Sequence, residues 1–210
     1  MKFYLISPNK ECNEFNPCNL NKIADYIDID YLQLRPKLET ENENLKFIEK
    51  NFKLFFEVCK KRKIKFILND NILLAKKLNF DGVHLGQTDI NCYNARKILG
   101  KKKIIGISCN NSIKLAKQAE KEGANYVAFG PAFSSKTKKS NKPIINKNHL
   151  KKQINILKIP FTIIGGIDHK NFFSLHKLKP NNIAIINSIW KFSKGSVEAA
   201  KLFNNLILKN

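Results

Sequence analysis

The sequence has no long hydrophobic run, and this excludes the usual ways of entering or crossing a membrane. No apolar stretch approaches the ~18 residues that a spanning helix needs. The apolar start at residues 1–7 (MKFYLIS) is too short for a secretory signal and lacks a small-residue cleavage site. We therefore expect residues 3–7 to form a first strand, and we expect a cytoplasmic protein without a membrane partner.

Paired cysteines are also missing. The five cysteines are widely spaced and form no CxxC pair; they are Cys12, Cys18, Cys59, Cys92 and Cys109. An odd number at such spacing argues against a disulfide scaffold and a zinc knuckle. We predict reduced structural thiols, with Cys109 near an expected strand end and thus close to a site.

Arginine is scarce as well. Only three of the 38 basic residues are arginine, and the net charge is +21. Such a charge is typical of proteins that bind nucleic acids or acidic substrates. However, the lysines are spread over the whole chain, and the many Asn, Ile and Lys residues share A/T-rich codons. We predict a solvated lysine surface and no nucleic-acid partner. The non-enzyme alternative is a basic nucleic-acid-binding protein, which requires one basic face with interleaved aromatic residues.

What the chain does have is a repeated rhythm of strand and helix. Eight short β-rich runs occur at residues 3–7, 31–35, 65–69, 82–86, 103–108, 126–130, 161–166 and 183–187. Apolar residues at helical spacing follow, most clearly at residues 44–60, 112–122 and 197–208. Alternating strands and helices predict right-handed βα units and a parallel sheet. Eight units without a flexible linker predict a single (β/α)₈ TIM-barrel domain over residues 1–210. A doubly wound open sheet is the alternative fold.

Polar residues gather where the predicted strands end, which in a barrel is the face that carries active sites. They are Arg35, Lys37, Asn69, Asp70, Gln87, Asp89, Ser108, residues 134–139, and Gly165 with Gly166. Gln33 and Arg35 alternate to the same side of their strand, inside the barrel. A buried guanidinium needs an anionic partner. We predict that Arg35 grips a phosphate; an internal salt bridge is the alternative.

Two aspartates and two loops complete the expected site. Asp70 and Asp89 follow neighbouring strands and predict a Mg²⁺ site, because this ion favours one or two carboxylates with phosphate and water. Alternatively, each aspartate caps the next helix. Residues 134–139 offer hydroxyls and lysines to a phosphate, or form only a flexible basic loop. Gly165 and Gly166, which we expect directly before a helix, offer backbone N–H groups to a phosphate, or form only a tight turn.

Two single residues have simpler interpretations. His84 lies inside a predicted strand, and we expect a hydrogen-bonded interior histidine in preference to a catalytic one. Trp190 follows the last predicted strand, and we expect a core residue.

These segments together resemble the thiamine-phosphate synthase family from about Tyr31 to Ile189. The matching motifs are Gln33-Leu34-Arg35-x-Lys37, Asn69-Asp70, Asp81-Gly82-Val83-His84-Leu85-Gly86-Gln87-x-Asp89, Gly106-Ile107-Ser108, Gly130-Pro131-x-Phe133-x-Ser135-Lys136-Thr137-Lys138 and Ile164-Gly165-Gly166-Ile167. Each motif alone is weak, whereas six in this order and spacing are specific.

The resemblance implies a Mg²⁺-dependent transferase acting on phosphorylated small molecules. Such enzymes join hydroxymethylpyrimidine pyrophosphate to a thiazole phosphate and release pyrophosphate. The implied catalytic residues are Arg35, Lys37 and Lys138. The implied contacts to the pyrimidine pyrophosphate are Gln33, Arg35, Lys37, Asn69, Ser108 and Lys138. The implied Mg²⁺ ligands are Asp70 and Asp89. The implied contacts to the thiazole phosphate are Ser135, Thr137, Gly166, Ile186 and Asn187.

The chain departs from the family's pattern at three positions. Pro36 stands where the family usually has a polar residue, Ser135 replaces the first threonine of Thr-x-Thr-Lys, and Asn187 aligns with a serine, although Ser188 is next in line. The related thiazole tautomerases are an alternative, but they lose the metal aspartates and carry a histidine at the place of Pro131. Another phosphate-binding barrel acting on sugar phosphates is more distant. A homo-oligomer is compatible with the sequence.

Overall fold

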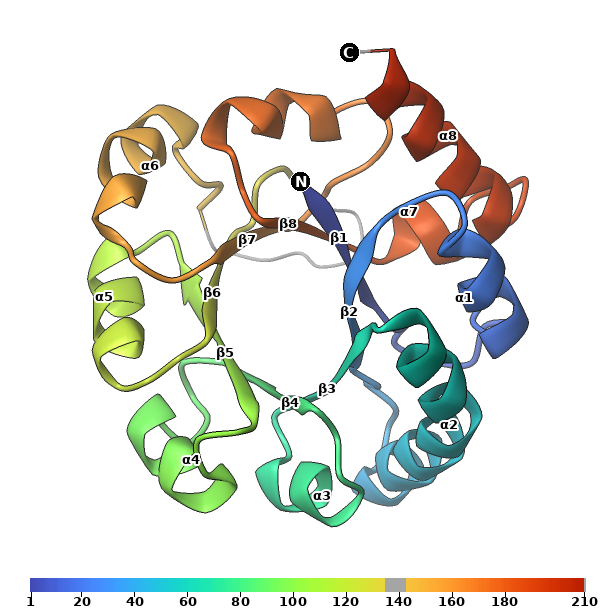
Figure 1. The fold of residues 1–210 in the computed structure, drawn as a ribbon, viewed down its shortest axis with the longest axis horizontal. Coiled ribbons are helices and arrows are strands. Elements are labelled where there is room, and N and C mark those ends of the chain that lie inside the picture. Colours follow the sequence, from blue (N-terminus) through green and yellow to red (C-terminus); the bar gives the residue numbers. More distant parts are fainter. Residues whose placement is uncertain (135–142, 210) are drawn as a thin grey trace.

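Eight parallel strands close into a barrel in the computed structural model, and helices surround it (Figure 1). The structure describes residues 1–134 and 143–209. The strands are β1 (Lys2–Ile6), β2 (Ile29–Leu34), β3 (Lys65–Asn69), β4 (Gly82–Leu85), β5 (Ile104–Asn110), β6 (Tyr126–Phe129), β7 (Phe161–Ile164) and β8 (Asn182–Ile185). They pair in sequence order, and β8 pairs with β1 to close the ring. The predicted (β/α)₈ barrel is confirmed, and the open-sheet alternative is wrong.

The helices lie between the strands along the chain and cover the outside of the barrel. In the described residues they are α1 (Pro17–Ile23), α2 (Glu41–Arg62), α3 (Ile72–Lys77), α4 (Cys92–Leu99), α5 (Ile113–Lys121), α6 (Lys147–Gln153), the 3₁₀ helices η1 (Ile154–Ile156) and η2 (Phe172–Leu178), α7 (Asn187–Trp190) and α8 (Ser196–Leu208). None of the helices that the structure describes is long and apolar enough to cross a membrane. Helix α2 begins earlier than its apolar pattern indicates because Thr40 and Glu43 form a capping box.

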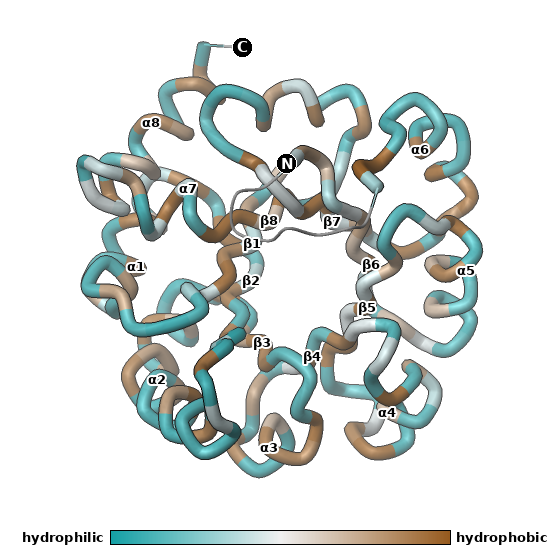
Figure 2. The backbone as a smooth tube through the Cα atoms, turned by 180° about the vertical axis from the view of Figure 1, so that it is seen from behind, coloured by the Kyte–Doolittle hydropathy of each residue, from teal (hydrophilic) through white to brown (hydrophobic). Residues whose placement is uncertain are grey.

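Alternation along the strands separates two hydrophobic clusters. Phe3 of β1 points outward and packs edge-on against Phe203 of α8, with ring centroids 5.2 Å apart. Its neighbour Tyr4 belongs to a small inner cluster with Ile6, Tyr126 and Ala184. Figure 2 shows the barrel from the opposite side, with hydrophobic residues on the strands and hydrophilic ones on the outer turns of the helices. Most of the core thus lies between barrel and helices, and the narrow interior is left for the site.

Trp190 and the cysteines belong to the outer packing. Trp190 is buried, and its indole N–H donates a 2.7 Å hydrogen bond to the carbonyl of Ile6, which confirms a core residue. The five cysteines are free thiols. Cys109 is buried in the outer cluster, on the opposite side of β5 from Ser108, so the expectation that it lies close to the site is wrong.

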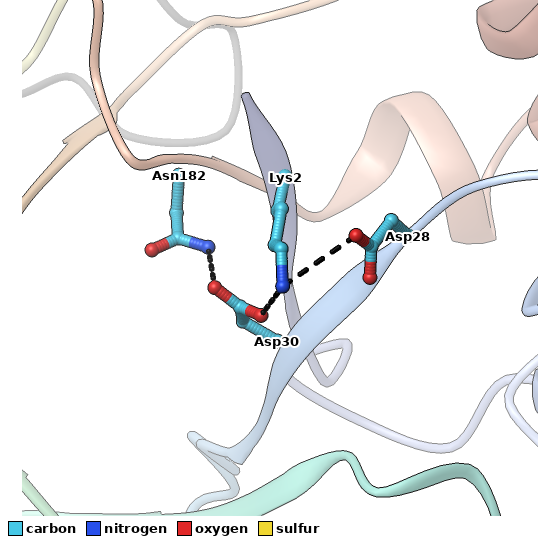
Figure 3. Close-up of polar contacts among 4 residues, drawn as sticks. All are labelled: Lys2, Asp28, Asp30 and Asn182. Atoms are coloured by element: carbon cyan, nitrogen blue, oxygen red, sulfur yellow. Dashed lines mark hydrogen bonds and ion pairs between the residues drawn. The ribbon is translucent and has the colours of Figure 1, made fainter.

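The amino-terminal end of the barrel carries a polar cluster (Figure 3). Nζ of Lys2 lies 2.9 Å from Asp30 and 3.5 Å from Asp28. The second carboxylate oxygen of Asp30 accepts a 2.8 Å hydrogen bond from the side-chain amide of Asn182, which is only 2% exposed. Strands β1, β2 and β8 are therefore joined where the barrel closes.

We expect Asp30→Ala to lower the free energy of unfolding by about 1–3 kcal/mol, because the buried amide of Asn182 loses its acceptor. Asp28→Ala removes only an exposed contact, and its expected cost is no more than about 1 kcal/mol. Urea denaturation followed by the fluorescence of Trp190 measures both. Equal losses in the two variants would show that the Asn182 amide does not depend on Asp30.

Candidate active site

A cavity of about 890 Å³ opens at the carboxyl end of the barrel, and all eight strands contribute to its wall. The predicted site residues that the structure describes all line it: Gln33, Arg35, Lys37, Asn69, Asp70, Asp89, Ser108, Gly166, Ile186 and Asn187. Ser135, Thr137 and Lys138, with most of the loop 134–139, lie outside the described residues. Segments that are far apart in the sequence thus meet around one space.

Strand β2 brings Gln33 and Arg35 to the interior, as its alternation predicted. Nε2 of Gln33 donates a 2.9 Å hydrogen bond to the hydroxyl of Tyr4. The backbone N–H of Arg35 donates to Oγ of Ser7 at 2.8 Å, which holds the end of the strand. In the described part of the chain, the buried Nε of Arg35 has no hydrogen-bond partner, and no ion pair involves its guanidinium. The salt-bridge alternative is therefore not found there.

Asp70 follows β3 in a left-handed backbone conformation, with φ of 63°. Its N–H donates to the carbonyl of His84 at 2.9 Å, which keeps the turn against β4. Partial burial and the neighbouring Asp89 carboxylate raise the pKa of Asp70 to about 6, although the charges of Arg35 and Lys37 act in the opposite direction. Two carboxylates that resist joint ionisation are a suitable place for a cation.

Asp89 is held by the turn that it follows. One of its carboxylate oxygens accepts a 2.6 Å hydrogen bond from the N–H of Gly86. The helices after β3 and β4 are capped by Asn71 and Asn91, not by Asp70 or Asp89. The helix-capping alternative for both aspartates is therefore wrong. Both residues line the cavity instead.

Along the cavity wall, a chain of hydrogen bonds crosses the inside of the barrel. The hydroxyl of Tyr4 lies 2.8 Å from that of Tyr126, which lies 2.9 Å from Nδ1 of His84. Nε2 of His84 lies 2.9 Å from Oγ of Ser108. Both ring nitrogens of His84 are thus paired, as expected for an interior histidine, and burial lowers its pKa to about 3.

Tyr4 and Tyr126, the tyrosines of this hydrogen-bond chain, were not predicted as site residues. In sequence, Tyr4 and Tyr126 are ordinary strand residues, because tyrosine is common in β-structure. The one signal available was the alternation of side chains along a strand, because both tyrosines stand at inward-facing positions.

The turn after β7 differs from the prediction. Gly165 and Gly166 have φ of 105° and 64°, but the next helical segment is η2, which begins only at Phe172. The expectation of a helix directly after the glycines is wrong. A Cβ at Gly166 would lie 2.5 Å from the carbonyl oxygen of Ser134 and 2.7 Å from that of Phe133. Gly166 therefore allows the chain after β6 to approach this turn.

The short helix next to the cavity follows β8. Ile186, Asn187 and Ser188, at the start of α7, line the cavity. In TIM barrels, the segments after strands seven and eight and a short extra helix commonly form a phosphate site. Asn187 and Ser188 both lie at this place, so the structure makes Ser188 a second candidate beside the aligned Asn187.

Three buried side-chain polar atoms lack a hydrogen-bond partner in the described part of the chain. They are Nε of Arg35, Oγ1 of Thr162 and Oγ of Ser188. All three residues line the same cavity. Because a buried polar group without a partner costs about 1–3 kcal/mol, this coincidence points to a ligand that supplies the partners. Thr162 escaped prediction because a threonine in the apolar run 161–164 is typical of a buried strand.

Comparison with known proteins gives the family. The model of the family described as thiamine monophosphate synthase matches residues 3–189. A thiamine-phosphate synthase of Pelagibacter ubique is 45% identical over 193 residues, which are 91% of this chain and 89% of the relative. One from Clostridium acetobutylicum is 34% identical over 209 residues, which are 100% of this chain and 96% of the relative.

Solved structures support the fold. Thiamine phosphate pyrophosphorylase from Pyrococcus furiosus has a TM-score of 0.80 at 24% identity, and the match covers 99% of this chain and 96% of that one. The 3-hexulose-6-phosphate synthase of Salmonella typhimurium has a TM-score of 0.66 at 14% identity, with 100% and 99% covered. At these identities the likeness shows the barrel alone, so the sequence relatives decide the family. The chain belongs to the thiamine monophosphate synthase family.

Proposed function

We propose that this chain joins 4-amino-2-methyl-5-hydroxymethylpyrimidine pyrophosphate to a thiazole phosphate, forming thiamine phosphate and releasing pyrophosphate. The observation that carries the proposal is the set of unpartnered buried donors in the cavity of a chain of this family. The tautomerase alternative is weaker, because Asp70 and Asp89 are retained and Pro131 stands in place of the histidine.

The pyrimidine pyrophosphate would bind toward β2, β3 and β5. Arg35 and Lys37 offer positive charge at the end of β2, and the unpartnered Nε of Arg35 is one prong of a fork that suits a phosphate. Asn69 and Ser108 offer neutral hydrogen-bonding groups beside them, and Gln33 lies at the floor. Lys138 is assigned to the same substrate by the family resemblance only.

Asp70 and Asp89 would hold Mg²⁺. Both residues line the cavity, and their carboxylates lie close enough for Asp89 to help raise the pKa of Asp70. A divalent cation between them would remove that repulsion, and Mg²⁺ is usually bound by one or two carboxylates together with phosphate oxygens and water. When bound, the ion would neutralise charge on the departing pyrophosphate.

The thiazole phosphate would bind toward β7 and β8. Gly166, Ile186 and Asn187 border this part of the cavity, and the resemblance adds Ser135 and Thr137. The unpartnered hydroxyl of Ser188 supports it as a further donor to the same phosphate. Because a Cβ at Gly166 would first meet Phe133 and Ser134, we assign this glycine to positioning the loop as much as to the phosphate.

The reaction asks for charge stabilisation and positioning. The bond between the pyrimidine methylene and pyrophosphate breaks, the electron-rich aminopyrimidine stabilises the cationic methylene, and the thiazole nitrogen attacks it. Arg35, Lys37 and Lys138 would offset the charge that grows on the leaving group. No side chain has to form a covalent bond, and holding the two substrates in line supplies much of the rate.

The direct test mixes the purified protein with both phosphorylated precursors and Mg²⁺ and measures thiamine phosphate by fluorescence after oxidation. We expect product only when both precursors are present. Conversion of a thiazole phosphate tautomer without coupling would favour the tautomerase instead. Absence of both reactions would refute the proposal.

Asp89→Asn should abolish coupling and stabilise the metal-free protein at pH 8. The sign follows from the pKa of Asp70, which folding raises to about 6 from a usual value of about 4. Ionisation of Asp70 therefore costs folding stability as the pH rises through that interval. The variant escapes the part of this cost that comes from the Asp89 carboxylate, while the larger part, which comes from burial, remains. Thermal melts at pH 4 and pH 8 with and without Mg²⁺ measure the effect.

The exposed aspartate Asp28 provides the control, since Asp28→Asn makes the same change of charge far from the cavity. We expect Mg²⁺ to raise the melting temperature of the native protein and of the control at pH 8, but not of Asp89→Asn. Coupling by Asp89→Asn at the native Mg²⁺ dependence would contradict the metal assignment.

Arg35→Lys should lower kcat/KM for the pyrimidine pyrophosphate by about tenfold or more, because lysine keeps the charge but loses the planar fork. Arg62→Lys is the matched control: this guanidinium contacts Asn21 and Asp25 on the outside of the barrel. We expect the control to leave kcat/KM unchanged. Native kinetics in Arg35→Lys would mean that the fork does not hold the substrate.

A further inference from the structure

The hydrogen-bond chain inside the barrel reaches the cavity at both ends and also through Tyr4 and His84. Gln33 lies at one end and Ser108 at the other, and both line the cavity. Between them the links are Tyr4, Tyr126 and His84, with donor–acceptor distances of 2.8–2.9 Å. Tyr126 itself does not line the cavity. A change at Tyr126 can therefore affect a ligand only through its neighbours.

Each link of this chain has a fixed proton supply. Burial raises the pKa of both tyrosines above the ordinary value, so each hydroxyl keeps its proton. Both ring nitrogens of His84 contact hydroxyl groups, which can donate or accept, so a neutral imidazole with one N–H and one bare nitrogen fits this place. A buried hydroxyl proton without an acceptor is costly, so a tyrosine that accepts from one neighbour in this chain donates to the other, and the neutral imidazole donates from one nitrogen and accepts at the other. The direction of the whole chain is therefore set once, and reversing one link reverses all of them.

The direction follows from the Gln33 amide. Its Nε2 donates to Tyr4. The distances of the next two contacts fit either direction, and the need to place each proton makes Tyr4 the donor to Tyr126 and Tyr126 the donor to Nδ1 of His84. His84 in turn donates from Nε2 to Oγ of Ser108. Ser108 is left with a proton to give, and Gln33 is left with its carbonyl oxygen as an acceptor and with one further amide N–H.

We propose that Tyr4, Tyr126 and His84 are positioning residues that couple Gln33 and Ser108, so that the cavity accepts a ring with a donor at one contact and an acceptor at the other. An aminopyrimidine carries this pair in its amino group and ring nitrogens. The 4-oxo analogue carries the opposite pair, an acceptor oxygen beside a ring N–H. The inference rests on the proposed function, since it concerns how that function's pyrimidine is recognised.

The backbone around Tyr126 is built to keep the ring in place. A Cβ at Gly106 of β5 would overlap the hydroxyl end of Tyr126, so only glycine leaves room for it. Tyr31 packs on the other side, with ring centroids 5.0 Å from Tyr4 and 5.1 Å from Tyr126. The glycine of the Gly106-Ile107-Ser108 motif thus acts on the site through Tyr126.

The test measures binding of the aminopyrimidine pyrophosphate and of its 4-oxo analogue by calorimetry. In Tyr126→Phe the ring remains but the chain is cut, so His84 and Ser108 can reverse independently of Gln33. We expect the preference for the amino compound to fall by about tenfold relative to the native protein, the value of one hydrogen bond. Affinity for the thiazole phosphate should not change.

Tyr31→Phe is the matched control, because it removes a hydroxyl from a ring in the same stack and leaves the chain intact. Its preference should equal the native one. Tyr4→Phe cuts the same chain nearer to Gln33 and should repeat the Tyr126→Phe result if that variant does not fold. An equal loss of affinity for both compounds, with the preference unchanged, would overturn the inference. The native protein's own synthesis of thiamine phosphate is measured in parallel, so a failure of the proposed function is seen separately.

Discussion

Inside a closed parallel barrel, every second side chain of each strand points into a narrow space from which bulk water is largely excluded. A polar group there must find a partner within the protein or in a ligand, because burial without one is costly. At the level of Tyr4 and Tyr126 the hydrogen-bond partners come from the protein itself. The two tyrosine rings also fill this part of the interior, as apolar side chains would. Nearer the carboxyl end, Arg35, Thr162 and Ser188 keep buried polar atoms that no described residue pairs. The candidate site therefore lies at the level of the barrel where buried polar groups are no longer paired with other described residues.

The use of arginine follows the same constraint. In a chain that is overwhelmingly lysine-rich, the three arginines stand where one side chain must serve several acceptors or reach a buried position. Arg96 donates to the carbonyls of Gly100, Lys103 and Gly123 and to Asn125. Arg62 joins α2 to Asn21 and Asp25. Arg35 has the same fork and points it into the cavity. Because arginine is so scarce in this chain, each of the three positions is informative.

Much of the fold was predictable because the barrel repeats one local pattern. Strand and helix periods recur eight times, so an error at any single element did not change the architecture. The helix expected after Gly165 and Gly166 was wrong because a glycine pair indicates a turn but does not specify the next element of the chain. In residues 44–60, helical spacing predicts one apolar face made of Leu45, Ile48, Phe52, Phe55, Phe56 and Cys59. Phe47 and Asn51 of α2 are buried as well, because the tilt of a helix on a curved sheet is a tertiary property.

The charged residues that line the cavity could be predicted from their own chemistry, whereas some of its neutral residues could not. Arg35, Asp70 and Asp89 are unusual at strand ends, and a charge near a core demands an explanation from sequence alone. Thr162 and Tyr126 are common strand residues whose importance comes from their neighbours in space. For Asp70 and Asp89, position in the sequence was misleading. Both precede helices and so resemble N-caps, yet Asn71 and Asn91 make the caps. Whether an oxygen faces its own backbone or a cavity depends on contacts that the sequence does not display.

The charge of the whole molecule and the charge of the cavity must be considered separately. The chain carries +21, but at physiological ionic strength the field of exposed lysines is screened beyond about 8 Å. Among the described side chains that line the cavity, the charged groups are Arg35, Lys37, Asp70 and Asp89, and His84 is neutral. Two cations and two anions nearly cancel, so this part of the site has little net attraction for a pyrophosphate. The balance turns positive only when a divalent cation occupies the aspartate pair or further cations join from residues such as Lys138. A cavity with little net charge would then respond to the metal and the polyanion together. A leaving group whose negative charge must be neutralised as it forms requires this.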